Sequence, residues 1–338
     1  MEGKYRNTDY MYASARIRAL EGRIAGRERL ERMIEARSSG EILSSLGEYG
    51  FSLVRAGADG TGAILREPTL ASALTEAYAE LFAMTEQSRV IDFLRYPTDC
   101  NNVKAQIKCF SRGVDARGLM IDGVGTLSLA EVENAFREKD FSAFPARLAE
   151  MIPVAEKQFA ETRNPQVVDL LLDRACYEDM LASAKASGVA FAVRLVETKI
   201  DLQNVITCVR LIRMALGTAG EAMLEEAYLV GGTVELSMLR EALSEGEAWL
   251  SERLLYTRYS DLLSAEEHLS LGQIEVRADD LFMEIVREAK YTPFGAEVLI
   301  GYAIAVEYEV KNIRIILAAK DAGLAPDGIR ERLRKSYV

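Results

Sequence analysis

The stretch Asp201-Leu-Gln-Asn204-Val205, followed by Val209, occurs three times along the chain in slightly different forms. Each copy has an acidic residue, an asparagine three positions later, and apolar residues one and five positions after the asparagine. The other two copies are Asp99-Cys-Asn-Asn102-Val103 with Ile107, and Glu309-Val-Lys-Asn312-Ile313 with Leu317. Successive asparagines lie 102 and 108 residues apart, which indicates that a unit of about 110 residues has been used three times.

A second repeated signature has the same period. It is a glycine followed by apolar residues four, seven and ten positions later. The three copies are Gly26 with Leu30, Met33 and Ala36; Gly125 with Leu129, Val132 and Ala135; and Gly232 with Leu236, Leu239 and Ala242. Apolar residues at this spacing share one helical face, so we expect core-packed amphipathic helices whose glycine breaks the preceding helix. The two markers agree on the register and divide the chain into residues 1–115, 116–220 and 221–338.

The helical signal extends over nearly the whole chain, so the predicted fold class is all-α. Residues 10–36 contain no proline, and their pattern favours either one long surface helix or two helices bent between Gly22 and Gly26. Pro165, which follows an asparagine, and Pro326, which precedes an aspartate, are typical of helix starts.

Strand-like patterns are short and sparse, and the only two are at residues 51–55 and 118–124. A single core stops growing at roughly 250 to 300 residues, so a chain of 338 residues is expected to have several cores. Three similar helical domains either extend as a solenoid or close into a three-fold pseudosymmetric ring with a central opening.

The composition is that of a soluble globular protein, with 49% hydrophobic and 28% charged residues. The net charge of −11 would repel a phosphate backbone, so nucleic acid is not an expected partner. The longest apolar stretch, residues 298–306, is much shorter than the about 20 residues of a transmembrane helix. We expect no transmembrane segment and no secretory signal. The cysteines, without a Cys-x-x-Cys pair, indicate buried, reduced thiols in a cytosolic compartment; they are Cys100, Cys109, Cys176 and Cys208.

The residues of the first repeated motif are the candidate site residues, and we expect their role to be structural. They are Asp99, Asn102, Asp201, Asn204, Glu309 and Asn312. Asparagine is a poor residue in the middle of a helix, so its return at one place in three copies indicates that the fold uses the amide. We expect these asparagines to be at least half buried and bonded to the backbone of a neighbouring loop or helix. The alternative is a polar site repeated three times around a pore.

No pattern in the chain predicts catalysis, and we assign no catalytic, cofactor-binding or metal-binding residue and no cofactor. The single histidine, His268, has no second histidine with which to build a zinc site or a triad. The glycines between Gly57 and Gly62 lack the Gly-Lys-Ser/Thr ending of a phosphate loop. The acidic run from Asp279 to Glu284 has no second acidic motif to complete a metal site.

Four stretches carry a resemblance to a known family, and it extends over essentially the whole chain. They are Tyr10-Met-Tyr-Ala-Ser-Ala-Arg-Ile-Arg-Ala-Leu20, Asp92-Phe-Leu-Arg-Tyr-Pro-Thr-Asp-Cys-Asn-Asn-Val-Lys104, Glu307-Tyr-Glu-Val-Lys-Asn-Ile-Arg-Ile-Ile-Leu317 and Gly323-Leu-Ala-Pro-Asp-Gly-Ile-Arg-Glu-Arg-Leu333. The sequence resembles the C subunit of the archaeal and bacterial V-type (A-type) ATP synthases, which is the counterpart of the d subunit in eukaryotic vacuolar ATPases.

The resemblance implies three similar helical domains arranged as a pseudo-three-fold funnel. It implies a non-catalytic central-stalk subunit that acts as a socket and couples the rotor shaft to the membrane proteolipid ring during ion transport. The implied partners are shaft subunits of the D and F type and the ring, with one copy per complex on the cytoplasmic face of the membrane. The alternative is a helical-repeat scaffold that binds a different coiled-coil or peptide partner.

Overall fold

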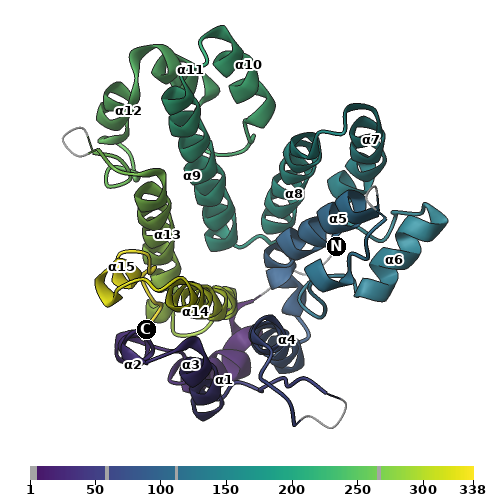
Figure 1. Cartoon of the computed structure of the whole chain (residues 1–338), viewed down its shortest axis with the longest axis vertical. Helices are drawn as coiled ribbons and strands as arrows, with labels where there is room; N and C mark the ends of the chain where they lie inside the picture. The colour runs from purple at the N-terminus through teal and green to yellow at the C-terminus, as the bar shows by residue number, and fades with distance from the viewer. Residues whose placement is uncertain (1–5, 58–60, 111–112, 265–267) are drawn as a thin grey trace. The chain divides into compact units, whose positions relative to one another are not determined.

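The structure is a computed structural model that describes residues 6–57, 61–110, 113–264 and 268–338. The described part is built from helices, and no strand occurs in it. The all-α prediction is therefore confirmed. The chain divides into two compact units (Figure 1): one combines Met1–Arg89 with Gly272–Val338, and the other is Val90–Leu271. The first unit is thus assembled from the two ends of the sequence.

Helix α14 (Ala296–Asp321) is the centre of the first unit. Its residues 298–306 are all buried, as expected for a helix that is apolar on every side. It packs against helices from both ends of the chain (Figure 1). The other helices of this unit are η1 (Asn7–Tyr10), α1 (Met11–Glu21), α2 (Arg27–Glu35), α3 (Ser39–Ser45), η2 (Leu46–Tyr49), α4 (Arg66–Met84), α13 (Leu271–Arg287), η5 (Glu288–Tyr291) and α15 (Pro326–Arg330). The short helix η3 (Ser88–Leu94) spans the boundary between the units.

The proline-free run at the N-terminus forms two helices. Helix α1 ends at Glu21, and α2 begins at Arg27 after the extended residue Gly26. Of the two predicted alternatives, the bent pair is confirmed. Leu30 and Met33 of the glycine signature are buried in a core cluster that also contains Ile313 and Leu317 of α14, so the first glycine signature packs on the third copy of the acid–asparagine motif.

The second unit is built around two long antiparallel helices, α8 (Pro165–Ser187) and α9 (Ala190–Met214). Asn164 caps α8 by accepting a hydrogen bond from the Gln166 N–H at 3.0 Å, which confirms the predicted helix start. Helix α8 packs against α5 (Tyr96–Phe110) and α7 (Ala146–Thr162), and α9 packs against α10 (Thr218–Ala227) and α11 (Leu236–Glu245). The remaining helices are η4 (Arg117–Leu119), α6 (Leu129–Glu138) and α12 (Glu247–Leu254).

Neither strand-like pattern forms a strand. Arg55 makes only an isolated antiparallel bridge with Ile64. Residues 118–119 belong to η4, and residues 120–124 are irregular chain. Segments this short need a partner strand to satisfy their backbone groups, and the described residues offer none. Among the helices of the described ranges, none combines the length and apolar character needed to cross a bilayer.

Candidate functional site

The two repeated signatures meet in the structure, and the copy around Asp201 has the most contacts. Oδ1 of Asp201, on α9, accepts hydrogen bonds from the backbone N–H groups of Thr233 and Val234 at 2.7 and 2.8 Å. Oδ2 accepts from the hydroxyls of Thr233 and Tyr259 at 2.7 and 2.6 Å. Gly232 precedes these donors, and a Cβ there would overlap Oδ1 of Asp201. The repeated acid and the repeated glycine are two halves of one contact, which we call an acid–glycine lock.

Asp99 on α5 forms the corresponding lock at Gly125. Its carboxylate accepts hydrogen bonds from the Thr126 N–H at 2.8 Å, the Thr126 hydroxyl at 2.5 Å and the Leu127 N–H at 3.3 Å. A Cβ on Gly125 would again overlap Oδ1 of the acid. Burial raises the pKa of Asp99, and these hydrogen bonds together with the charge of Arg95 oppose that rise.

The third lock, at Glu309 on α14, has the same plan with fewer donors. Oε1 of Glu309 accepts one hydrogen bond, from the Ala25 N–H at 2.6 Å, just before Gly26. Burial raises the pKa of Glu309 to about 7, against the opposing effects of the Ala25 N–H and the Arg29 charge. At Gly26 an added Cβ would make only an ordinary contact, 3.6 Å from a methyl group of Val338. The third copy therefore retains the acid's contact and has no steric need for the glycine.

The three repeated asparagines make one further contact in common. Each is 1% exposed, and each side-chain amide pairs with both the N–H and the C=O of a single loop residue, at 2.8 to 3.0 Å. The pairs are Asn102 with Ile121, Asn204 with Leu229, and Asn312 with Arg334. The amide bonds to the loop residue as the backbone of a neighbouring strand would. It therefore satisfies an N–H and a C=O of the loop that burial would otherwise leave unpaired.

Replacing one of these asparagines by leucine should remove both contacts at once. We expect Asn204→Leu or Asn102→Leu to lower the free energy of unfolding by about 1 to 3 kcal/mol, because a buried donor and acceptor lose their partners. Urea unfolding followed by circular dichroism measures this. The matched control is Asn101→Leu, since Asn101 is the exposed neighbour of Asn102 on the same helix. An equal effect at positions 101 and 102 would contradict a role for the amide.

The order in which helices and glycines pair is cyclic. Helix α5 pairs with Gly125 and α9 with Gly232, in each case the next glycine signature along the chain. Helix α14 has no later signature and pairs beside Gly26, the first one. Each lock therefore joins an acid in one third of the sequence to a glycine signature in another.

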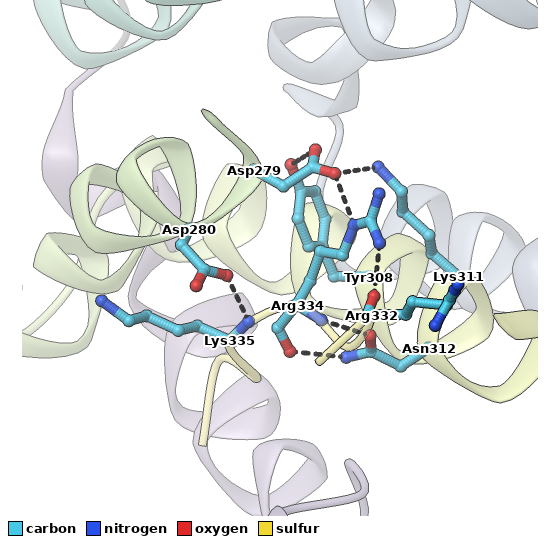
Figure 2. A network of polar contacts seen from close by, with 8 residues as sticks. All are labelled: Asp279, Asp280, Tyr308, Lys311, Asn312, Arg332, Arg334 and Lys335. Carbon is cyan, nitrogen blue, oxygen red and sulfur yellow. Dashed lines mark hydrogen bonds and ion pairs between the residues drawn. The ribbon is translucent and has the colours of Figure 1, made fainter. Parts of the chain in front are cut away.

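A separate polar network surrounds Asp279 on α13 (Figure 2). Its Oδ1 accepts from the Tyr308 hydroxyl at 2.9 Å, and its Oδ2 accepts from Lys311 Nζ at 2.5 Å and Arg334 Nε at 2.8 Å. Burial acts against ionisation of Asp279, but the charge and hydrogen bond of Lys311 and the bonds from Arg334 and Tyr308 outweigh it and lower its pKa. The backbone C=O and N–H of Arg334 also pair with the Asn312 side chain. This network and the third asparagine contact therefore hold the same segment.

The acidic run containing Asp279 is thus occupied by structural contacts. Asp280 accepts from the Lys335 N–H at 2.7 Å (Figure 2), and Glu284 pairs with the Lys335 ammonium. No local pattern predicts these contacts, because Lys335 lies about 50 residues from the acidic run along the chain. Within the described ranges, no group of three histidine, cysteine or acidic side chains is placed to hold a metal ion.

Three further features singled out in the sequence remain: the histidine, the glycine-rich stretch and the cysteines. His268 is exposed. The glycine-rich stretch between Gly57 and Gly62 lies partly outside the described residues, since 58–60 are not among them. The four cysteines are free and buried.

Two pockets lie near the motif helices. In the first unit a pocket of about 400 Å³ is bordered by Glu309, Arg23, Glu80 and Tyr302. In the second unit a groove of about 630 Å³ runs between α8, α9 and α10, and Asp173, Tyr177, Met214 and Met223 are among its lining residues. Neither brings together the acid, base and nucleophile that a catalytic site requires.

The helix-and-loop contacts, which recur at three asparagines, are those of an all-α protein whose buried polar side chains hold loops against helices. Over residues 13–332 the sequence matches the ATP synthase (C/AC39) subunit family. The chain belongs to this family.

Archaeal and bacterial relatives have nearly the same sequence identity to this chain. The C subunit of the A-type ATP synthase of Methanocaldococcus jannaschii is 25% identical, over 96% of this chain and 86% of the relative. The protein of the same name in Haloferax volcanii is 25% identical, over 95% of this chain and 96% of the relative. The C subunit of the V-type sodium ATPase of Enterococcus hirae is 24% identical, over 70% of this chain and 72% of the relative.

Proposed function

We propose that this chain is the non-catalytic adaptor of a rotary A/V-type ATPase, the socket that seats the rotor shaft on the membrane proteolipid ring during ion transport. Its partners are then shaft subunits of the D and F type and the ring, on the cytoplasmic face, with one copy per complex. The observation that carries the proposal is the family match over residues 13–332, which includes all three acid–glycine locks.

The chemistry of the locks supports a mechanical role. Their carboxylates and amides bind backbone groups of the same chain, so these polar atoms hold loops against helices. A protein that transmits torque needs stiffness, and close-packed interiors tied together by buried hydrogen bonds transmit strain. The net charge of −11 is also complementary to a ring whose cytoplasmic loops are rich in lysine and arginine.

The funnel is part of the proposal, with helical units at residues 1–115, 116–220 and 221–338 around a central opening. Its support is the cyclic order of the locks. In an open row of repeats the last acid helix would have no glycine signature to contact, whereas Glu309 contacts the segment before Gly26. An experimental structure of the assembled complex, with α5, α9 and α14 in unlike environments, would contradict the funnel.

Omitting this chain should uncouple the machine. We expect the soluble head of the complex to continue hydrolysing ATP while ion uptake is lost, because rotation no longer reaches the membrane ring. The measurement is ATPase activity alongside ion uptake in reconstituted vesicles prepared with and without the chain, and adding the purified chain back should restore uptake.

Two outcomes would contradict the adaptor. One is full ion pumping without the chain, and the other is ATP hydrolysis by the purified chain alone. If the chain instead copurifies from its native membranes with a helical partner outside the ATPase, the scaffold alternative replaces the adaptor.

A further inference from the structure

Two of the four buried cysteines lie on the facing helices of one helix pair. Cys100 lies on α5 and Cys176 on α8, and the two side chains are 1% and 4% exposed. A hydrogen bond with Cys100 and burial raise the pKa of the Cys176 thiol well above its ordinary value. Cys100 Sγ in turn donates to the backbone carbonyl of Leu172, one turn before Cys176 on α8, at 3.4 Å. The two sulfurs are therefore neighbours on facing helices.

Contact of this kind is the main geometric requirement for a disulfide. A disulfide needs Cβ atoms about 3.8 Å apart, and Cys100 Sγ already lies within hydrogen-bond distance of the α8 backbone one turn before Cys176. Both cysteines are free thiols. The pair joins helices that pack directly on each other, so bridging does not require the helices to come together first.

A cation lies beside the pair. Lys104, one turn beyond Cys100 on α5, holds its Nζ 2.5 Å from Asp173 Oδ1 on α8, and its side chain is 12% exposed. Its charge favours the thiolate of Cys176, which is the reactive form of cysteine, although the hydrogen bond with Cys100 and burial outweigh it and keep the pKa of Cys176 raised. Asp173 and Tyr177, on either side of Cys176 in the sequence, also line the groove of about 630 Å³.

The remaining cysteines lack these features. Cys208 on α9 donates to the Leu239 carbonyl at 3.5 Å. Cys109 is buried near the end of α5, nine residues from Cys100. Burial is the one cause that raises the pKa of Cys208, whereas Cys100 also acts on Cys176, so the pair at 100 and 176 is distinct.

We propose that Cys100 and Cys176 are a latent disulfide site, which a two-electron oxidant such as hydrogen peroxide converts into a covalent bridge between α5 and α8. The Cys100 sulfur attacks the peroxide, the O–O bond breaks, and a sulfenic acid and water form. The Cys176 sulfur then attacks the Cys100 sulfur and expels a second water. The two sulfurs lose two electrons in total, and hydrogen peroxide is reduced to two waters.

The bridge would reinforce the first acid–glycine lock. Cys100 lies between Asp99 and Asn102, the two residues through which α5 holds the loop of residues 121–127. Cross-linking residues far apart in the sequence removes conformational freedom from the unfolded chain. The oxidised protein should therefore unfold at a higher temperature than the reduced one, and a reductant should reverse the change.

The test uses the full-length chain under native conditions. Protein treated with hydrogen peroxide is alkylated, digested without reduction and analysed by mass spectrometry, and its unfolding midpoint is measured before and after dithiothreitol. We expect a peptide that joins Cys100 to Cys176 and a midpoint several degrees higher that dithiothreitol returns to the starting value. In Cys176→Ser the bridge is lost and Cys100 becomes trappable as a sulfenic acid, while the control Cys208→Ser still forms the bridge.

Peptide mapping of the oxidised protein without substitutions decides the proposal even if a variant does not fold. Absence of the Cys100–Cys176 peptide after oxidation would overturn it. So would equal yields of bridges that include Cys109 or Cys208, because that pattern indicates disulfide formation in unfolded chains. A bridge that forms without any change in the unfolding midpoint would overturn the claim that it reinforces the α5 contact.

Discussion

Replacing Gly232 by alanine should be among the most destabilising single changes in this chain. The new Cβ would overlap Oδ1 of Asp201 and lie 3.0 Å from a methyl group of Ile200. The aspartate cannot move aside freely, because Thr233, Val234 and Tyr259 hold it through four hydrogen bonds. We expect the free energy of unfolding to fall by about 3 to 5 kcal/mol, the sum of overpacking and weakened bonds to a buried charge.

The chain supplies its own controls for this prediction. Gly125→Ala should behave like Gly232→Ala, since the added Cβ meets Asp99 in the same way. Gly118→Ala, in the same segment as Gly125, enters open space and should change stability by less than about 0.5 kcal/mol. Gly26→Ala should cost no more than about 1 kcal/mol, because the third lock leaves room for a methyl group and only the helix cap is altered. Equal effects at positions 26, 118 and 232 in denaturant unfolding would contradict the lock.

Glu309→Gln should stabilise the protein at pH 8 and leave its stability nearly unchanged at pH 4.5. Burial raises the pKa of Glu309 from its ordinary value of 4.5 to about 7. A difference of this size corresponds to about 3 kcal/mol between the folded and unfolded states. The glutamine oxygen can still accept the Ala25 N–H that Glu309 accepts at 2.6 Å, and the amide has no charge to bury.

The direction of the pH dependence follows from which state binds the proton. Below pH 4.5 the carboxyl group is protonated in both states, so it contributes nothing to the difference. Between pH 4.5 and about 7 the unfolded chain loses the proton and the folded chain keeps it, so the stability of the unmodified protein falls as pH rises. Above pH 7 the full cost of burying the charge is present.

Urea unfolding of both proteins at pH 4.5, 6 and 8 tests this expectation. The stability difference between Glu309→Gln and the unmodified chain should grow with pH and level off above pH 7. Glu331→Gln is the matched control because Glu331 is exposed, and it should give no pH-dependent difference. A constant difference for Glu309→Gln across the three pH values would mean that the carboxyl group titrates normally.

Local patterns along the chain were sufficient to predict the helical fold class and the burial of the repeated asparagines. A period near one third of the length is visible because the same local contacts need the same residue types three times. An asparagine in the middle of a helix, such as Asn204, stands out because it opposes local helix propensity, so a tertiary contact has to explain it. Helix starts such as Pro165 were also predictable, since they depend on neighbours in the chain.

The partner that each repeated residue contacts is set by the packing of helices and is not visible in any local pattern. Glu309 binds Ala25, 284 residues away, and no short stretch of sequence states that the last copy pairs with the first glycine signature. In the sequence pattern Gly26 is equivalent to Gly125 and Gly232, whereas in the structure only the latter two lie against a carboxylate. Spatial proximity depends on how helices distant in the sequence pack, while sequence periodicity reports only the face of each helix that will be buried.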